Sequence, residues 1–495
     1  MRSLLIINQN NMPKSLEITD FTNHPAVKKC MDDLKKQFPG TPGKELIVSD
    51  VLDGHGNQYV NLVQKGGGVL GIALVGYTYI LEEMGIRFLR LAGTSAGAIN
   101  TALMTVIGDD KTVPKSREIL KDICALNFFD LVDGNAAAKW LIRTFITHKN
   151  FSRQAKNLVS IIFGLLAFFV VADIVFLGLQ HTYPILTIAT KISFILTGFY
   201  LMLLAALAFY ISTLVKRLKE SGFGINPGDF FYDWIKKRLC ENHVVTVADL
   251  NKKALATPDL HLRTPHPHGT SDLKGDVTFI TSELVSQNKI EFPKMCNLFR
   301  TDINLLQPAG FIRASMSIPI FFESYYINDI PCEDDQIKKA WCDTFGEDNP
   351  PSKARFVDGG ILSNFPINIF YNKDVVTPRL PSFGINLDDS TPESKTNDAA
   401  QWSLLSYIGR MFNTIRFYYD KDFFIKNRVF SKGVGTIPLA KYNWLNFFLT
   451  DKDKIDMFVL GAQAATDFLG KFKWEEFKAH RKIMHEQLEA KETAK

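Results

Sequence analysis

The segment Gly93-Thr94-Ser95-Ala96-Gly97 is the stretch of this 495-residue sequence from which the fold can be inferred. It follows an apolar run typical of a strand, residues 86–92, and precedes a run typical of a helix, residues 98–104. A strand that turns sharply into a helix needs residues without bulk on both sides of the turn, and Gly93 and Gly97 meet that need. The hydroxyl of Ser95 then stands at the tip of the turn, above a helix N-terminus. This geometry suits a nucleophile that attacks an ester or amide carbonyl.

A second glycine-rich turn precedes the first. A predicted strand, residues 59–63, leads into Lys65-Gly66-Gly67-Gly68-Val69-Leu70-Gly71, and an apolar helix is expected from Val69 to about Met84. The glycine spacing matches a dinucleotide-binding fingerprint, but that interpretation needs an acidic residue at the end of the next strand, where the chain has Gly93-Thr94-Ser95. We favour an oxyanion hole, because adjacent glycines let backbone N–H groups approach a developing negative charge. A turn that binds nothing is the other alternative.

A candidate base for the serine lies far downstream. Residues 355–360, Arg-Phe-Val-Asp-Gly-Gly, read as a short strand that ends in Asp358 and two glycines, and a loop over residues 361–366 follows. An aspartate before glycine is also common in ordinary turns, so Asp358 alone is ambiguous. A conventional triad is disfavoured, because only His480 and His485 follow Asp358 and both lie in a charged helix that looks solvated. The histidines lack partners at metal-ligand spacing, and no metal is expected.

Taken together, these segments resemble the patatin-like phospholipase family. That family has a glycine-rich oxyanion loop, a GxSxG serine and a DGG or DGA aspartate in this order. Residues 313–322 look like its Ala-Ser-x-x-x-Pro block. The resemblance covers roughly residues 55–110 and 275–390. Many bacterial members carry a basic residue where this chain has Leu70, which puts a local salt bridge in doubt rather than the chemistry.

The resemblance implies a serine–aspartate dyad, Ser95 and Asp358, that works without histidine or a cofactor. Asp358 would accept the proton of Ser95, and an acyl-enzyme would form and be released by water. The oxyanion hole would be made by Gly66, Gly67 and Gly68. The glycines that support the motifs would be Gly71, Gly93, Gly97, Gly359 and Gly360. The substrates it implies are phospholipids, lysophospholipids or neutral lipids.

Strands that alternate with helices predict an α/β fold, here a patatin-like three-layer fold with a mostly parallel central sheet and catalytic loops at the carboxyl ends of its strands. The candidate strands are residues 46–48, the runs before Gly66, Gly93 and Asp358, residues 277–280 and residues 383–387. We expect an N-terminal extension (1–43), two core parts (44–110 and 276–400), an insertion between them (111–275) and a C-terminal helical region (401–495).

Two apolar runs inside the insertion predict a transmembrane hairpin. They cover about residues 158–179 and 192–215, and each is long enough to cross a bilayer as a helix. Both flanks are basic, which places both ends of the hairpin, the catalytic domain and both termini in the cytoplasm. A pair of buried core helices is the alternative. We expect the single charge within the first run, Asp173, to pair with Lys191 across the hairpin or to snorkel.

Composition limits the remaining classes of partner. A net charge of +5 without a long basic stripe argues against nucleic acid. Six dispersed cysteines without a CxxC pair indicate reduced thiols in a cytosol-facing protein. Aromatic residues between 412 and 424 are expected mainly as helix core, with an acyl pocket or a bilayer contact as alternatives.

The sequence therefore predicts a membrane-anchored lipid acyl hydrolase of the phospholipase A or lysophospholipase type, whose partners are the bilayer and an acyl-lipid substrate. A lipid acyltransferase or a triacylglycerol lipase could use the same dyad. A non-catalytic membrane scaffold or sensor that keeps the fold is the rival from another class. The head group, the acyl position, the activating signal and the oligomeric state stay open.

Overall fold

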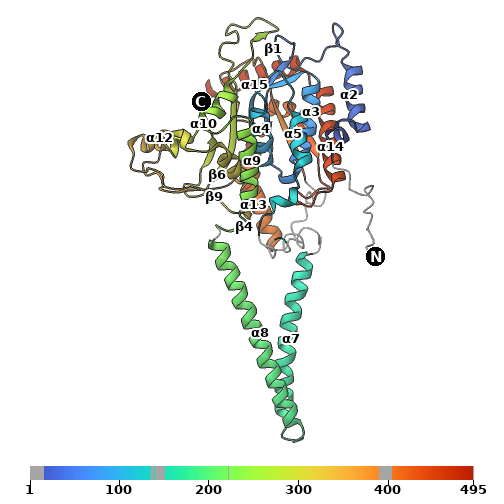
Figure 1. Cartoon of the computed structure of the whole chain (residues 1–495), viewed down its shortest axis with the longest axis vertical. Coiled ribbons are helices and arrows are strands. Elements are labelled where there is room, and N and C mark those ends of the chain that lie inside the picture. The colour runs from blue at the N-terminus through green and yellow to red at the C-terminus, as the bar shows by residue number, and fades with distance from the viewer. Residues whose placement is uncertain (1–15, 135–138, 140–150, 221, 390–403, 494–495) are drawn as a thin grey trace, which may run out of the picture. The chain divides into compact units, whose positions relative to one another are not determined.

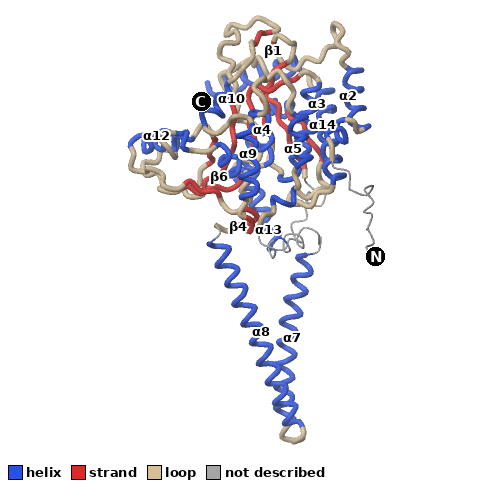
Figure 2. Tube along the Cα trace, in the orientation of Figure 1, coloured by secondary structure: helices blue, strands red, loops and turns tan. Residues whose placement is uncertain are grey.

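The computed structural model describes residues 16–134, 139, 151–220, 222–389 and 404–493. The chain divides into two compact units. The first comprises the described parts of 1–132, 228–319 and 324–495 and holds a ten-stranded sheet with its helices (Figures 1 and 2). The second comprises the described parts of 133–227 with 320–323. Each unit is described by itself below.

The sheet of the first unit follows the order β12-β11-β2-β3-β6-β10-β9. The strands from β12 to β6 are parallel, whereas β10 runs antiparallel to both β6 and β9. Three short strands, β1, β5 and β7, pair antiparallel at its margins. The bounds are β1 Val51–Asp53, β2 Gln58–Gln64, β3 Ile86–Thr94, β5 Leu260–Leu262, β6 Asp276–Glu283, β7 Lys289–Phe292, β9 Tyr325–Ile327, β10 Ala354–Asp358, β11 Ser382–Asp388 and β12 Val434–Pro438. The predicted α/β class is confirmed.

The strand predicted at residues 46–48 is wrong. These residues form no regular element, and the first strand begins at Val51. The side chain of Gln58 is the physical reason. Its Oε1 accepts from the backbone N–H of Val48 at 2.8 Å, and its Nε2 donates to the carbonyl of Leu46 at 2.7 Å. A glutamine amide thus satisfies the backbone groups that a neighbouring strand would otherwise pair.

Helices pack against this sheet, as the blue and red elements of Figure 2 show. Helix α4 contacts β2, β3 and β6, helix α11 contacts β6 and β10, and helix α14 contacts β12 and helix α3. The bounds are α1 Ile18–Thr22, α2 Pro25–Gln37, α3 Gly71–Glu83, α4 Ala96–Val106, α5 Ser116–Ala125, α9 Asp229–Glu241, α10 Val247–Leu255, α11 Pro308–Ser315, α12 Asp335–Phe345, α13 Leu404–Lys426, α14 Asp451–Lys471 and α15 Trp474–Thr493.

An aromatic cluster anchors β10, the strand that carries the predicted base. The ring of Phe356 on β10 lies 5.6 Å from that of Phe292 and 5.4 Å from that of Phe299. Phe292 stacks on Phe311 of α11, with 4.3 Å between the ring centroids. All four side chains are almost fully buried. Packing of this kind fixes the strand that bears Asp358 against the helix that precedes residues 316–319.

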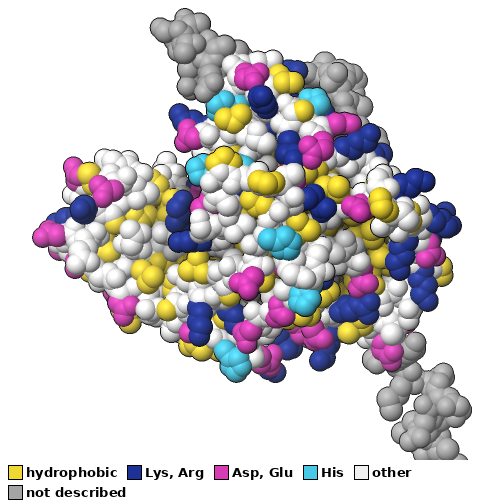
Figure 3. Space-filling view, turned by 90° about the horizontal axis from the view of Figure 1, so that it is seen from above, with side chains coloured by type: hydrophobic (Ala, Val, Ile, Leu, Met, Phe, Trp, Pro, Cys, Tyr) yellow, Lys and Arg dark blue, Asp and Glu magenta, His cyan; other side chains and the backbone are white. Residues whose placement is uncertain are grey.

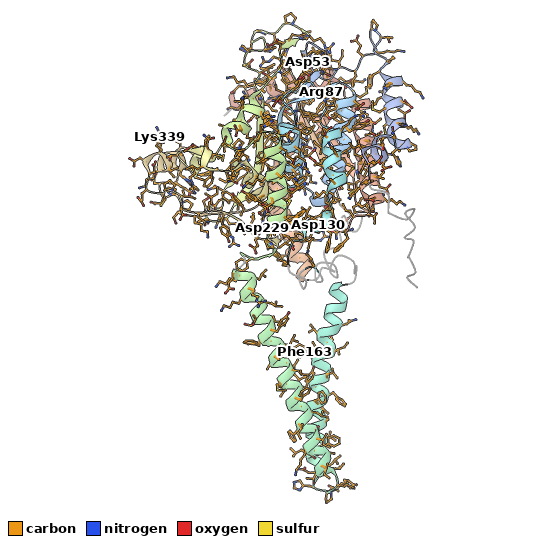
Figure 4. The ribbon with its side chains drawn as sticks, viewed as in Figure 1. Asp53, Arg87, Asp130, Phe163, Asp229 and Lys339 are labelled. Carbon is orange, nitrogen blue, oxygen red and sulfur yellow. The ribbon has the colours of Figure 1, made fainter. Side chains whose placement is uncertain are left out.

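The second unit contains two helices that are long and apolar enough to cross a membrane. They are α7, Phe151–Leu179, and α8, Leu186–Glu220, and their candidate spans have mean hydropathies of 2.7 and 2.2. Many of their apolar side chains are exposed, among them Phe163 at 66%, which is labelled in Figure 4. The first predicted span matches α7, and the second lies inside the longer α8. The same unit holds a small parallel pair, β4 Gly224–Asn226 and β8 Ile320–Phe322.

A polar seam joins the two long helices. Asp173 is buried between them and accepts a hydrogen bond from the hydroxyl of Ser193 at 2.5 Å. The hydroxyl of Thr190 donates to the carbonyl of Phe176, and that of Tyr200 donates to the carbonyl of Ile162. Within the described residues no ion pair links Asp173 to Lys191, whose side chain is exposed, so a serine takes the place that we expected for the lysine. Side-chain hydrogen bonds of this kind hold apolar helices together.

Candidate active site

Ser95 sits in the strained turn that the glycine pattern predicts. It is the residue before α4, with φ 53° and ψ −122°, and its side chain is buried. A β-carbon on Gly93 would lie 2.3 Å from the carbonyl oxygen of Gly97, and one on Gly97 would lie 2.3 Å from that of Gln64. Any larger residue would therefore collide with the backbone at either position. The tight packing holds a non-glycine residue at a positive φ, which costs about 1–3 kcal/mol when unsupported.

Asp358 reaches the same end of β3 from the opposite direction. Thr94, the last residue of β3, pairs with Ile280 of β6, and Asp358, the last residue of β10, pairs with Thr281. Strand β7 pairs with residues 279–282 of β6, so β3 and β10 both lie on the other side of β6, where their ends face each other. Their last residues lie opposite adjacent residues of β6, a step of about 3.4 Å along the strand. The catalytic loops expected at the carboxyl ends of a mostly parallel sheet thus include one that follows an antiparallel strand, β10.

Two serines of the segment after α11 connect Ser95 and Asp358. The hydroxyl of Ser315 accepts from the backbone N–H of Ser95 at 3.0 Å and donates to the carbonyl of Ile280 at 2.7 Å. The carbonyl of Ser317 accepts from the backbone N–H of Asp358 at 2.8 Å. Both serines are fully buried. The sequence assigns no role to residues 313–322. In the structure, this segment makes hydrogen bonds to both candidate catalytic residues.

The glycine loop after β2 closes over Ser95. A β-carbon on Gly66 would lie 3.0 Å from Cβ of Ser95, and one on Gly68 would lie 2.2 Å from the carbonyl oxygen of Trp444. Gly68 also has φ 55°, which favours glycine. The N–H of Gly66 donates to the carbonyl of Asn364 at 3.0 Å. Within the described residues the N–H groups of Gly67 and Gly68 have no hydrogen-bond acceptor, so these two amides are available to a developing oxyanion.

The loop after Asp358 fastens these parts to one another. The side chain of Asp358 accepts from the N–H of Gly360 at 2.7 Å, which shapes the turn. The hydroxyl of Thr94 donates to the carbonyl of Ser363 at 3.0 Å, and the side-chain amide of Asn364 donates to the carbonyl of Gly66 at 3.3 Å. Residues 363–364 therefore contact both the end of β3 and the glycine loop.

The chain belongs to the patatin-like phospholipase family. The sequence profile of this family matches residues 62–371, which is more than half of the chain. The uncharacterized protein YqhO of Bacillus subtilis (strain 168) is 25% identical over 414 residues, covering 83% of this chain and 98% of the relative. The crystal structure of VipD from Legionella pneumophila aligns with a TM-score of 0.37 at 14% identity, covering 88% of this chain and 73% of VipD. The family supports a lipid acyl hydrolase activity.

A narrow apolar cavity adjoins the patatin-like site. It has a volume of about 70 Å³, and its lining includes Gly68, Ala96 next to Ser95, and Trp234 of α9. Its other lining residues are Val69, Gly71, Ile72, Val75, Ile99, Asn100, Leu103, Ile119, Ile123, Leu126, Phe128, Leu131 and Phe231. Sequence analysis missed this cavity because α5 and α9 are far apart in the chain. Another cavity, of about 660 Å³ between β12, α14 and α15, contains none of the predicted site residues among its described lining.

The remaining predicted groups lie elsewhere. His480 is exposed on α15 and lies within hydrogen-bond distance of Lys432 and of the carbonyl of Glu476. Phe423 and Phe424 of α13 pack against the cluster around Phe365, as expected for helix core, whereas Tyr418 is exposed. The side chains of Phe412, Phe417 and Tyr419 lie outside the described residues. In the described part of the chain, no group of three or more His, Cys, Asp or Glu side chains is arranged to hold a metal ion.

The charge distribution on one face of the first unit is mixed. Seen from above in Figure 3, Lys and Arg side chains alternate with Asp and Glu side chains over the described surface. This face therefore shows no extended stripe of one sign among its described residues.

Replacing Ser315 with alanine should destabilise the fold around Ser95. Ser315→Ala removes the acceptor of a buried N–H and a donor to a buried carbonyl, which costs about 1–3 kcal/mol for the unsatisfied group. The free energy of unfolding, measured by denaturant titration in detergent, should fall accordingly. The control is Ser431→Ala, since that exposed serine bonds only locally to the carbonyl of Arg428. Equal stabilities of the two variants would contradict the connecting role of Ser315.

Proposed function

We propose that this patatin-like protein is a membrane-anchored lipid acyl hydrolase, of the phospholipase A or lysophospholipase type, in which Ser95 is the nucleophile and Asp358 the base. The observation that carries the proposal is the pair of bonds from Ser315 to Ser95 and from Ser317 to Asp358. They hold a strained serine and a buried carboxylate next to each other along one side of β6. A non-catalytic scaffold would not require a serine at φ 53° beside a loop in which two backbone N–H groups lack an acceptor among the described residues.

The dyad would work in two half-reactions. Asp358 accepts the proton from Oγ of Ser95 as the serine attacks the ester carbonyl of the lipid. The N–H groups of Gly67 and Gly68 stabilise the oxyanion, and one such donor typically contributes about 2.7–4 kcal/mol to the transition state. The tetrahedral intermediate collapses, the alcohol leaves with the proton held by Asp358, and the acyl group stays on Ser95. Asp358 then deprotonates a water that attacks the acyl-enzyme, and the fatty acid departs.

The apolar cavity supports an acyl chain as the group that is transferred. It begins at the two residues beside the reacting carbonyl, Gly68 and Ala96, and its lining is almost entirely aliphatic or aromatic. Burial of apolar surface contributes about 0.8 kcal/mol per CH₂ group. A cavity of about 70 Å³ accepts only the first carbons of a chain, so the rest would pass Phe128 and Trp234 toward the surface.

The hairpin would hold the enzyme at the surface where its substrate lies. Helices α7 and α8 expose apolar side chains along most of their length, and the side chains of Asp173, Thr190, Ser193 and Thr197 are buried. This is the arrangement that a bilayer requires, because hydrocarbon cannot satisfy polar groups. Tethering raises the effective concentration of a lipid substrate at the site.

Removing either member of the dyad should abolish the activity. For Ser95→Ala and Asp358→Asn we expect fatty-acid release from mixed phospholipid and lysophospholipid to fall at least about 10³-fold, because nucleophile and base act as one unit. Ser431→Ala, an exposed serine outside the site, is the control and should retain wild-type rates. Ser95→Ala protein that still released fatty acid at the wild-type rate would exclude Ser95 as the nucleophile.

Enlarging the apolar cavity should change the acyl-chain preference. Trp234→Ala enlarges the cavity where α9 lines it, so the ratio of kcat/KM for long over short acyl chains should rise several-fold, at about 0.8 kcal/mol per additional buried CH₂. Tyr232→Ala is the matched control, since Tyr232 lies on the same helix but does not line the cavity. If both variants keep the wild-type ratio, the acyl chain lies elsewhere.

The hairpin prediction can be tested by thiol labelling in intact cells. A cysteine introduced as Thr182→Cys, in the connection between α7 and α8, should react from outside with a membrane-impermeant maleimide. The exposed Cys240 of the same chain is an internal control, which should react only after the cells are permeabilised. Labelling of Cys240 in intact cells would contradict the proposed orientation.

A further inference from the structure

One buried carboxylate beside the site belongs to neither the dyad nor its two serine contacts. Asp420 lies on α13 and is 7% exposed. Its Oδ1 accepts from the hydroxyl of Ser363 at 2.9 Å, and its Oδ2 accepts from the backbone N–H of Phe365 at 2.9 Å. Both oxygens of the carboxylate are thus bonded to the loop that follows Asp358. Nothing in the sequence motifs pointed to this residue, because α13 lies outside them.

The loop that Asp420 holds touches both halves of the site. Ser363 accepts from Thr94, the neighbour of Ser95, and Asn364 exchanges two hydrogen bonds with Gly66. A β-carbon on Gly66 would lie 2.5 Å from Oδ1 of Asn364 and 3.0 Å from Cβ of Ser95, so the loop closes directly on the nucleophile. Displacement of residues 363–365 would release the glycine loop and its two amides from their position.

We infer that Asp420 is a positioning residue for hydrolysis: its ionised carboxylate clamps residues 363–365 and thereby holds the oxyanion loop against Ser95. The inference rests on the proposed function of the dyad. Two acceptors are needed at once, one for the Ser363 hydroxyl and one for the Phe365 amide, and only the carboxylate form supplies both. A protonated carboxyl becomes a donor at one oxygen, so the charge-assisted bonds to Ser363 and Phe365 are replaced by weaker neutral ones.

The surroundings of Asp420 make the clamp sensitive to pH. A pocket of about 380 Å³ adjoins it, whose other charged lining residues are Lys65 after β2 and Lys421 on α13 itself. Lys65 donates to the side chain of Asn386 and to the carbonyl of Leu387. Burial raises the pKa of Asp420 to about 6, while the bonds from Phe365 and Ser363 and the charge of Lys65 limit that rise. We therefore expect the clamp to weaken as the pH falls through about 6.

Stability and activity should respond to this group in opposite directions. A carboxyl whose pKa rises on folding from 3.8 to about 6 contributes stability below pH 4 that is lost as the pH rises through 6. Activity, in contrast, needs the ionised form and should rise over the same interval. A loss of rate in acid can therefore not be attributed to unfolding around Asp420.

The test compares pH profiles of fatty-acid release for the full-length chain in lipid vesicles. Wild type should show an acid limb near pH 6. In Asp420→Asn the acid limb of the profile should move to lower pH. Above pH 7, kcat should fall roughly 10- to 100-fold, because one charge-assisted hydrogen bond is lost, and KM should change little. Ser363→Ala removes a donor to the ionised form, so its limb should move to higher pH. This second variant leaves the prediction testable if Asp420→Asn fails to fold.

Asp422→Asn is the matched control. It removes a carboxylate from the same helix that pairs with Lys426 at 2.6 Å and does not touch the loop, so its profile should superimpose on that of wild type. An active wild type whose profile is unchanged in both Asp420→Asn and Ser363→Ala overturns the positioning role alone. A wild type that releases no fatty acid from any acyl lipid overturns the proposed function instead.

Discussion

The hydroxyl of Ser315 makes the interaction on which the rest of the site depends. It stands between the N–H of Ser95 and the carbonyl of Ile280, and so connects the turn after β3 to the neighbouring strand β6. Two residues later the carbonyl of Ser317 takes the N–H of Asp358. One short segment thus fixes the relative position of two residues that are far apart in the sequence. Because every group involved is buried, none of these bonds can be exchanged for water without cost.

Close backbone packing supports the same arrangement from the other side. Gly93, Gly97 and Gly66 each approach a neighbouring backbone or Ser95 so closely that a β-carbon would collide. These contacts hold Ser95 at its positive φ, while the N–H groups of Gly67 and Gly68 have no acceptor among the residues that the structure describes. The strain and the unbonded amides together are the features expected of a preorganised acyl-transfer site rather than of a packing motif.

The sequence was most informative where chemistry depends on neighbouring residues. The turn at Ser95 and the strands around it follow from glycines and apolar runs within a few positions, and the structure has them. The direction of β10 could not be predicted, since antiparallel pairing with β6 is decided by contacts such as Phe292 with Phe356 that join distant segments. The apolar cavity and Asp420 were missed for the same reason. The strand predicted at residues 46–48 is wrong because the side chain of Gln58 makes hydrogen bonds to backbone groups of this segment. Hydrophobic patterning does not reveal such bonds.

In the hairpin, too, contacts between distant residues could not be predicted from the sequence. Its two apolar runs were visible in the sequence, but the partner of Asp173 was not, because charge alone suggested Lys191 while the packed faces of α7 and α8 bring Ser193 to the carboxylate. Asp173 therefore bonds to the hydroxyl of Ser193 on the buried face of α8, whereas Lys191 lies on the exposed face.

The central claim is that Ser95 carries the acyl group during turnover. The most direct measurement is acid quenching of the purified protein during hydrolysis of a phospholipid, followed by mass spectrometry of its tryptic peptides. The account predicts one acyl group on the peptide of residues 91–111, attached at Ser95. An acyl group attached at another residue, or none on a protein that is turning over, would contradict it.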